Sequence, residues 1–148
     1  MDWHAHVTVA AIIKQDGKFL VVEEIVDGET VINNPAGHLE DGESLVEAIK
    51  REVLEETGRE FDPEDIVGVY LWRHPEVNAS ILRVAFQGHV GEQDPGRKLD
   101  PEIVQSLWLS ADELRGREAE HRSPLIMRGV NDFLAGHRYS LALLDYLP

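Results

Sequence analysis

The sequence predicts an α/β fold, of the α+β kind, in which a mixed β-sheet is flanked by helices. Valine- and isoleucine-rich segments separated by short turns predict strands near the N-terminus. A well-capped helix follows them, and further strands and two shorter helices are expected towards the C-terminus. No repeat or linker interrupts the 148 residues, so we expect a single domain over residues 1–148.

The strands are predicted from runs of β-branched residues. Residues 6–14 (HVTVAAIIK) and 19–26 (FLVVEEIV) flank the turn Gln15-Asp16-Gly17, and we expect them to pair with each other. Asp27-Gly28 marks a second turn, so the N-terminal region is expected to consist of antiparallel hairpins. The proline and glycines of residues 33–42 predict a loop, and later strands are expected at 67–72, 80–90 and 105–109.

The principal helix is predicted to begin at about Ser44 and to end before Gly58. Ser44 and Glu47 form a capping-box pattern at its start, and a glycine such as Gly58 commonly ends a helix. Two shorter helices are expected to follow, one capped by the segment 110–113 and one opened by Ser123-Pro124. The last helix has apolar residues at helical spacing, namely Ile126, Val130, Phe133 and Leu134.

The composition excludes several classes of partner. The chain has 14 basic and 28 acidic residues, a formal net charge of -14 at pH 7, which disfavours binding to a polyanion such as DNA. It has no cysteine, no apolar run of about 18 residues and no secretory pattern at its start, so we expect a cytoplasmic protein without a membrane partner. A small phosphorylated substrate is still compatible, because bound divalent cations reverse the local sign of charge.

The principal helix carries carboxylates on the face that ought to be apolar. At about 100° per residue, Leu45, Ala48, Ile49 and Val53 define an apolar stripe about 140° wide, which runs from Ala48 through Leu45 to Val53. Glu52 and Glu56 fall within about 20° of Leu45, and Glu55 borders the stripe. A solvated acidic face would lie on the opposite side of the helix, so these glutamates are expected to point inward.

Carboxylates that converge on an inward face need a cation. Like charges at these spacings repel, and burial without a partner is costly. Oxygen ligands at this density suit a hard ion, so we expect Mg²⁺, with Mn²⁺ as an alternative, rather than zinc. The alternative is a solvated face on which Arg51 pairs with Glu47 and Glu55. His4 and His6 lack a third ligand at a familiar spacing for zinc.

A fixed pattern occupies residues 37–59. Gly37 is followed after five residues by Glu43 and after seven more by Arg51-Glu52-Val53-Leu54-Glu55-Glu56-Thr57-Gly58. This pattern resembles the Nudix box, in which every fixed glycine and polar position has this spacing. Arg59 departs from the pattern, because the box has an apolar residue there.

The resemblance extends beyond the box to segments that occur in the same order in bacterial Nudix phosphatases of the NudJ type. These segments are HVTVA at 6–10, GKFLVVEE at 17–24, NPAGHLE at 34–40, RSPL at 122–125 and RY at 138–139. The resemblance implies a Nudix α/β/α sandwich. It also implies Mg²⁺-dependent hydrolysis of a diphosphate linkage in a nucleoside di- or triphosphate, or in a thiamin-precursor pyrophosphate.

The same resemblance assigns roles to residues. The metal ligands would be Glu52, Glu55 and Glu56 with the backbone carbonyl of Gly37, and Glu55 or Glu56 would take the proton from the attacking water. Glu43 and Arg51 would tie the loop to the helix. Nudix enzymes often add an acid from a loop before a late strand, where the chain offers Glu92, Asp94, Asp100 and Glu102, and Glu102 is the best match.

Substrate contacts are expected from five residues outside the helix. The candidates are Asn34, His38, Trp72, Arg83 and Arg122. A surface ion pair is the alternative for Arg83, and a place in the core or at the rim is the alternative for Trp72.

Three other functions stay open at this point. The chain is alternatively a catalytically silent Nudix-fold module that binds a nucleotide or metal, or an interaction domain whose acidic helix meets a basic partner. It is alternatively an enzyme that acts on a dinucleotide polyphosphate or a nucleotide sugar. The sequence is compatible with a monomer or a homodimer.

Overall fold

A computed structural model describes residues 3–148 and contains two β-sheets rather than one. The larger is a mixed sheet of five strands in the order β5 (Ala36–His38), β1 (His4–Ile12), β7 (Ala79–Val90), β6 (Phe61–Arg73) and β9 (Tyr139–Ser140). The smaller is antiparallel and consists of β2 (Lys14–Gln15), β3 (Lys18–Val26), β4 (Glu29–Asn33) and β8 (Ile103–Leu109). The predicted mixed sheet flanked by helices is therefore confirmed, and the second sheet is an addition to it.

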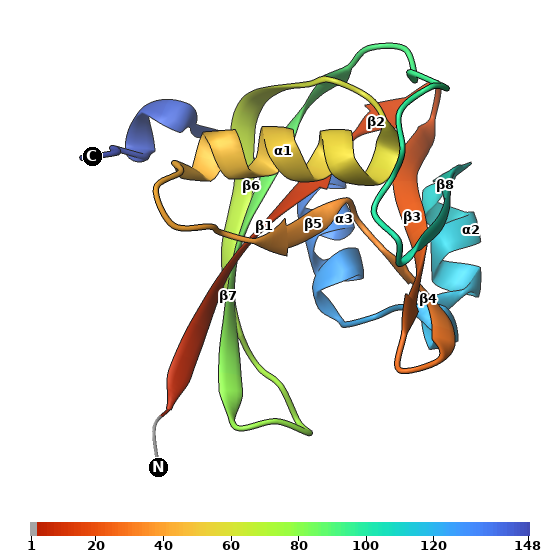
Figure 1. Cartoon of the computed structure of the whole chain (residues 1–148), viewed down its shortest axis with the longest axis horizontal. Helices are drawn as coiled ribbons and strands as arrows, with labels where there is room; N and C mark the ends of the chain where they lie inside the picture. Colours follow the sequence, from red (N-terminus) through yellow and green to blue (C-terminus); the bar gives the residue numbers. More distant parts are fainter. Residues whose placement is uncertain (1–2) are drawn as a thin grey trace.

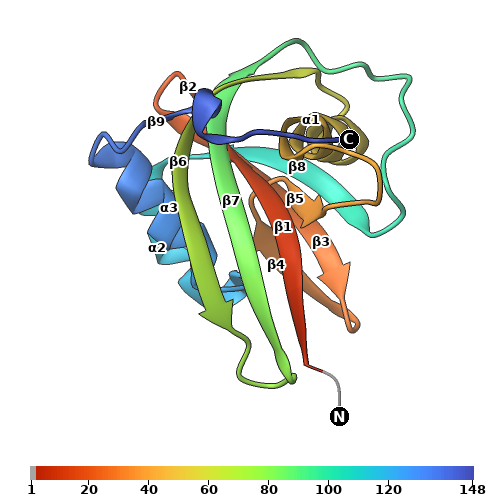
Figure 2. The same cartoon turned by 90° about the vertical axis from the view of Figure 1, so that its left-hand side faces the viewer.

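Helices cover both faces of the larger sheet (Figures 1 and 2). Helix α1 (Leu45–Thr57) lies on one face, and α2 (Ala111–Gly116) and α3 (Leu125–Leu134) lie towards the other. Two short 3-10 turns, η1 (Glu118–Glu120) and η2 (Leu141–Leu143), complete the elements. The two faces give two hydrophobic cores, one containing Ile49 and Phe86 and the other containing Ile12 and Val130. No helix within residues 3–148 is long and apolar enough to cross a membrane.

The predicted hairpin between residues 6–14 and 19–26 is wrong for most of its length. Strand β1 pairs with β5 and in parallel with β7, and only Lys14 and Gln15 of β2 pair with β3. The physical reason is that every side chain from Val9 to Ile13 is buried. A strand that is buried on both faces is typical of the middle of a sheet and not of an isolated hairpin.

Two other segments extend beyond their predicted limits. Residues 36–38 form β5 inside the predicted loop, because they pair with Thr8, Val9 and Ala10, which are distant in sequence. Strand β6 begins at Phe61 rather than residue 67, and a shift in register directly after Pro63 accommodates the proline. Neither pairing leaves a local signal in the sequence.

The prediction of the principal helix is confirmed. Ser44 and Glu47 form the capping box, with the Glu47 N–H donating to Ser44 Oγ at 3.1 Å and the Ser44 N–H donating to Glu47 Oε1 at 3.2 Å. Gly58 ends the helix in the left-handed region at φ 71°. In α3, Ile126 and Val130 are buried as predicted, whereas Leu134 is exposed because it lies at the last turn.

We predict that Gly58→Ala lowers the free energy of unfolding by about 1–2 kcal/mol, because a side chain in the left-handed region is strained. The added Cβ would also lie 3.2 Å from the carbonyl oxygen of Asp94. Urea unfolding followed by circular dichroism measures the change. Gly91→Ala is the control, since a Cβ at Gly91 meets nothing within 4 Å. Equal losses for the two variants would contradict the prediction.

Candidate active site

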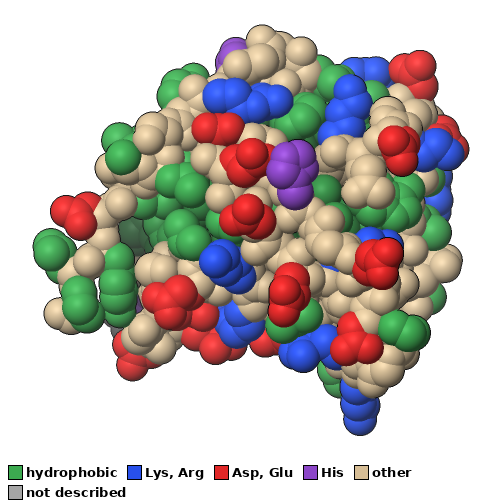
Figure 3. Space-filling view, turned by 90° about the horizontal axis from the view of Figure 1, so that it is seen from above, with side chains coloured by type: hydrophobic (Ala, Val, Ile, Leu, Met, Phe, Trp, Pro, Cys, Tyr) green, Lys and Arg blue, Asp and Glu red, His purple; other side chains and the backbone are tan. Residues whose placement is uncertain are grey.

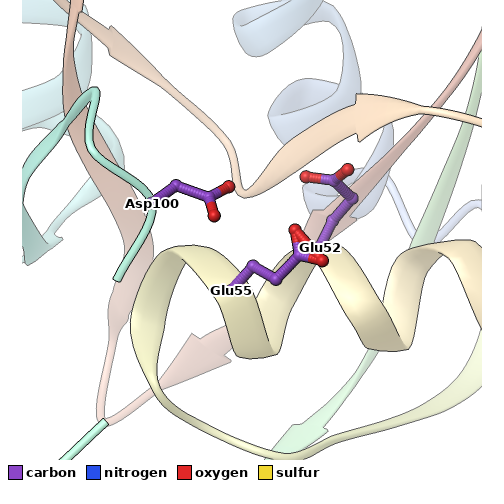
Figure 4. A group of neighbouring side chains, drawn as sticks. All are labelled: Glu52, Glu55 and Asp100. Carbon is purple, nitrogen blue, oxygen red and sulfur yellow. The ribbon is translucent and has the colours of Figure 1, made fainter. Parts of the chain in front are cut away.

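Helix α1 gathers its carboxylates against the larger sheet. Glu52 and Glu56 are only 7% and 4% exposed, on the same face as Ala48, Ile49 and Val53. Carboxylate oxygens of Glu52, Glu55 and Asp100 lie within 4.8 Å of one another. Figure 4 shows Glu52 and Glu55 reaching from the helix towards the space that Asp100 enters from the opposite side. The expectation that these glutamates point inward is therefore confirmed for Glu52 and Glu56, and Glu55 is half-buried at the border.

Burial opposes the negative charge on these groups. Burial raises the pKa of Glu52 to about 7 and that of Glu56 to about 9, and neighbouring carboxylates add to both shifts. Glu56 is held by a hydrogen bond of 3.0 Å from the Ala36 N–H to its Oε1 atom. A group of acidic oxygens that repel one another in this way fits a hard divalent cation, which would favour their charged forms.

Arg51 fastens the loop before α1 to the helix. Its Nε and Nη2 atoms donate to Glu43 at 3.0 and 2.7 Å, and its Nη1 donates to Glu52 at 2.6 Å. Its Nη2 also donates to the His38 carbonyl at 3.0 Å. These contacts lower the pKa of Glu43 and raise that of Arg51. The expected structural link between Glu43 and Arg51 is present.

Strand β5 lies directly over the acidic cluster. A Cβ atom on Gly37 would collide with the carboxylate of Glu52, so only glycine allows the backbone to approach so closely. The strand is anchored by its pairing with β1 and by the Leu39 N–H, which donates to the Val7 carbonyl at 3.0 Å. This approach brings the backbone of the predicted ligand Gly37 next to the predicted ligand Glu52.

The loop between β7 and β8 supplies an acid that sequence reasoning ranked below another. Asp100 joins the cluster because its N–H donates to the Glu55 carbonyl at 3.0 Å. The preferred candidate, Glu102, is exposed and lies outside the group that Asp100 forms with Glu52 and Glu55. Asp100 was one of four acids considered, and nothing periodic in this loop distinguishes it. Glu92 and Asp94 do not belong to the acidic group either.

Two cavities meet at β5. The first, of about 480 Å³, is lined by carboxylates, namely Glu24, Glu40, Glu52, Glu55, Glu56, Asp100 and Glu102, together with Arg51. The second, of about 170 Å³, lies between the larger sheet and the start of α3 and includes Trp72, His74 and Arg83 in its lining. Ala36, Gly37, His38 and Arg122 line both. A molecule with phosphates in the first cavity would therefore reach the second with its remaining part.

Arg83 lies at the second cavity and is 6% exposed, so its alternative role in a surface ion pair is wrong. Its Nη1 and Nη2 atoms donate to Asn34 and Asn33 side-chain oxygens at 3.3 and 3.4 Å. Its buried Nε atom has no partner among the described residues 3–148. Burial lowers its pKa to about 10. The Nε atom is itself inaccessible, so a ligand in the second cavity would meet this guanidinium through its Nη atoms, each of which carries a second N–H.

Of the other predicted substrate contacts, three line the cavities and one holds a residue that does. Trp72 lines the second cavity beside His74, with ring centroids 5.0 Å apart. His38 and Arg122 line both cavities, and burial lowers the pKa of His38. Asn34 is buried and holds Arg83. Sequence reasoning missed Glu24, which lies in the segment 17–24 without a role of its own, and Asn33, which begins the predicted loop.

On the face seen from above in Figure 1, acidic side chains are interspersed with lysine and arginine rather than forming one continuous surface of either sign (Figure 3). The first cavity, by contrast, brings together the side chains of seven acidic residues.

Comparison with known proteins identifies the family. A family model described as the NUDIX domain matches residues 3–128. The chain belongs to the Nudix family. The phosphatase NudJ of Escherichia coli K12 is 38% identical over 139 residues, which cover 94% of this chain and 90% of that protein.

Solved structures of other Nudix proteins share the fold. A Nudix hydrolase from Nitrosomonas europaea is 50% identical with a TM-score of 0.95, covering 97% of this chain and 98% of that one. A MutT protein from Methanosarcina mazei Go1 is 25% identical with a TM-score of 0.72, covering 92% and 98%. These relationships show that the chain is a Nudix hydrolase that acts on phosphoric anhydrides.

We predict that Gly37→Ala lowers turnover by about 100-fold, because the new Cβ would displace the Glu52 carboxylate from the Nudix acidic cluster. The fold should survive, since the atoms that must move are the end of a side chain. Steady-state kinetics and a thermal melt measure the two effects. Gly116→Ala is the control, because its Cβ meets nothing within 4 Å. Unchanged turnover in the Gly37 variant would contradict the prediction.

Proposed function

We propose that this Nudix hydrolase uses Mg²⁺ to cleave the diphosphate linkage of a nucleoside di- or triphosphate, or of a similar small compound such as a thiamin-precursor pyrophosphate. The observation that carries the proposal is the convergence of Glu52, Glu55 and Asp100 within a cavity that opens at β5 into a second cavity. The first cavity suits phosphates and metal, and the second suits the organic group.

The proposed metal site uses oxygen ligands from α1 and from the loop before β8. Glu52, Glu55 and Glu56 are the proposed ligands, with the Gly37 carbonyl and with Asp100 as an acid from outside the box. When bound, a hard divalent cation offsets phosphate charge and lowers the pKa of a coordinated water. The carboxylates would hold the cation, because without it their own negative charge would repel the phosphates of a substrate.

The proposed general base is Glu55 or Glu56. Both carboxylates line the first cavity, and either has an oxygen free for the water proton if it is not fully used as a ligand. Glu55 is the more accessible of the two, and Glu56 is fixed by the Ala36 N–H at 3.0 Å. Accessibility favours Glu55 for proton exchange with solvent, and fixation favours Glu56 for alignment.

The organic part of the substrate is proposed to occupy the second cavity. Trp72 and His74 offer flat surfaces for a ring, and Arg83 offers donors to a ring carbonyl or ring nitrogen. Arg122 lies where the cavities join and is placed to meet the phosphate next to the organic group. The similarity to the phosphatase NudJ supports a phosphorylated substrate.

We predict that Glu56→Gln lowers turnover by about two to three orders of magnitude while leaving the fold intact. Glutamine keeps an oxygen to accept the Ala36 N–H but loses the negative charge that a cation needs. Steady-state kinetics at saturating Mg²⁺ measure the loss. Glu47→Gln on the exposed side of the same helix is the control and should retain normal rates. A rate near wild type for Glu56→Gln would count heavily against the proposed metal site.

A substrate panel tests the proposed reaction. The panel contains ATP, ADP, a thiamin-precursor pyrophosphate, a dinucleotide polyphosphate and a nucleotide sugar, each with Mg²⁺ and with excess EDTA. We expect turnover of the first three that EDTA abolishes, and separation of phosphate from pyrophosphate among the products locates the cleaved bond. Turnover confined to the last two would redirect the substrate assignment. Binding without turnover of any compound would support a silent binding module instead.

A further inference from the structure

Glu24 is a buried carboxylate with no part in the proposed metal site. It lies on β3 where the pairing with β8 shifts register, and it is 3% exposed. Its side chain lines the first cavity near Glu56 but is outside the group formed by Glu52, Glu55 and Asp100. Burial of an ionised carboxylate costs free energy unless hydrogen-bond or charged partners compensate for it. The partners of Glu24 therefore indicate its role.

The contacts of Glu24 link the two arginines of the cavities. Arg122 Nη1 donates to Glu24 Oε1 at 2.8 Å, and Asn33 Nδ2 donates to the same oxygen at 3.3 Å. Because the Asn33 amide nitrogen faces Glu24, its oxygen is left to accept from Arg83 Nη2 at 3.4 Å. The result is a continuous chain of hydrogen bonds from Arg122 through Glu24 and Asn33 to Arg83.

This chain compensates two positive charges that would otherwise repel. Arg122 lines both cavities and its charge lowers the pKa of Arg83, whereas the charge on Glu24 acts in the opposite direction. Within residues 3–148, only Glu24 has a carboxylate oxygen within 4.0 Å of Arg122, and no carboxylate lies so close to Arg83. Glu24 is thus the carboxylate on which the arrangement of both guanidinium groups depends.

We infer that Glu24 is a positioning residue that holds Arg122 and Arg83 at the junction of the two cavities. Held there, they would bind the phosphate and acceptor atoms nearest the organic part of the substrate. The inference rests on the proposed function and deepens it, since it selects substrates in which a phosphate is directly joined to an organic group. Inorganic polyphosphate would gain little from this arrangement.

The test is Glu24→Gln, which keeps the shape of the side chain and removes its charge. We expect KM to rise about tenfold, as the loss of a charged hydrogen-bond partner would cause, with kcat within about twofold of wild type. The Mg²⁺ concentration for half-maximal rate should not change. The substrate is whichever of ATP, ADP and the thiamin-precursor pyrophosphate has the highest kcat/KM in the wild type.

The matched control is Glu23→Gln on the same strand. Glu23 also pairs with one arginine, Arg117, at 3.0 Å, but it lines neither cavity. This variant should have a normal KM. Equal effects of the two variants on KM would show that loss of any ion pair of β3 has this effect, and would overturn the inference.

A double-mutant cycle separates positioning from metal binding. If Glu24 acts through Arg122, Glu24→Gln in an Arg122→Ala background should change KM by less than threefold, because the guanidinium it holds is already gone. Full additivity of the two changes would contradict the inference. A raised Mg²⁺ requirement in Glu24→Gln would assign Glu24 to the metal site instead.

Binding measured without turnover distinguishes this inference from the proposed reaction. Titration of ADP, followed through tryptophan fluorescence because Trp72 lines the second cavity, should show about tenfold weaker binding in Glu24→Gln than in the wild type. Weaker ADP binding by the variant would support the inference even if the wild type hydrolysed none of the compounds. Absence of hydrolysis by the wild type would contradict the proposed function alone. Equal ADP affinity in both proteins would sink the inference alone.

Discussion

The concentration of negative charge on the buried face of one helix is the constraint on which the rest of the structure depends. Glu52 and Glu56 occupy positions where the spacing of α1 calls for apolar side chains, and they lose solvation there. The surroundings offset this cost with a capping box at the start of the helix, with Arg51 on Glu43 and Glu52, and with a backbone N–H on Glu56. These contacts keep the helix in its position although the repulsion and desolvation of its buried carboxylates oppose that position.

The parts of the site that were predictable from the sequence lie on one regular element. Helical periodicity fixes the relative directions of Glu52, Glu55 and Glu56, and capping residues fix where the helix begins and ends, so both were predicted correctly. The pairing of β1 with β7 was not predictable in this way, because it joins segments far apart in sequence and was mistaken for a local hairpin.

The same distinction explains which site residues were missed. Asp100 reaches the cluster through one backbone hydrogen bond to Glu55, and a loop has no period from which that direction follows. The roles of Glu24 and Asn33 depend on contacts among β3, β4 and the segment before α3, which the fold brings together. Arg83 was proposed from its place on a strand, but its hydrogen bonds to Asn33 and Asn34 join segments that are far apart in sequence.

The passage of the chain from one sheet into the other also limits how the enzyme can move. A single residue, Ile13, separates β1 of the larger sheet from β2 of the smaller, and it is 1% exposed. A short link that is buried in this way disfavours hinge motion between the two sheets at this point. We therefore expect the cavities at β5 to be largely formed before a substrate binds, with adaptation to different substrates left to the surface segments around them.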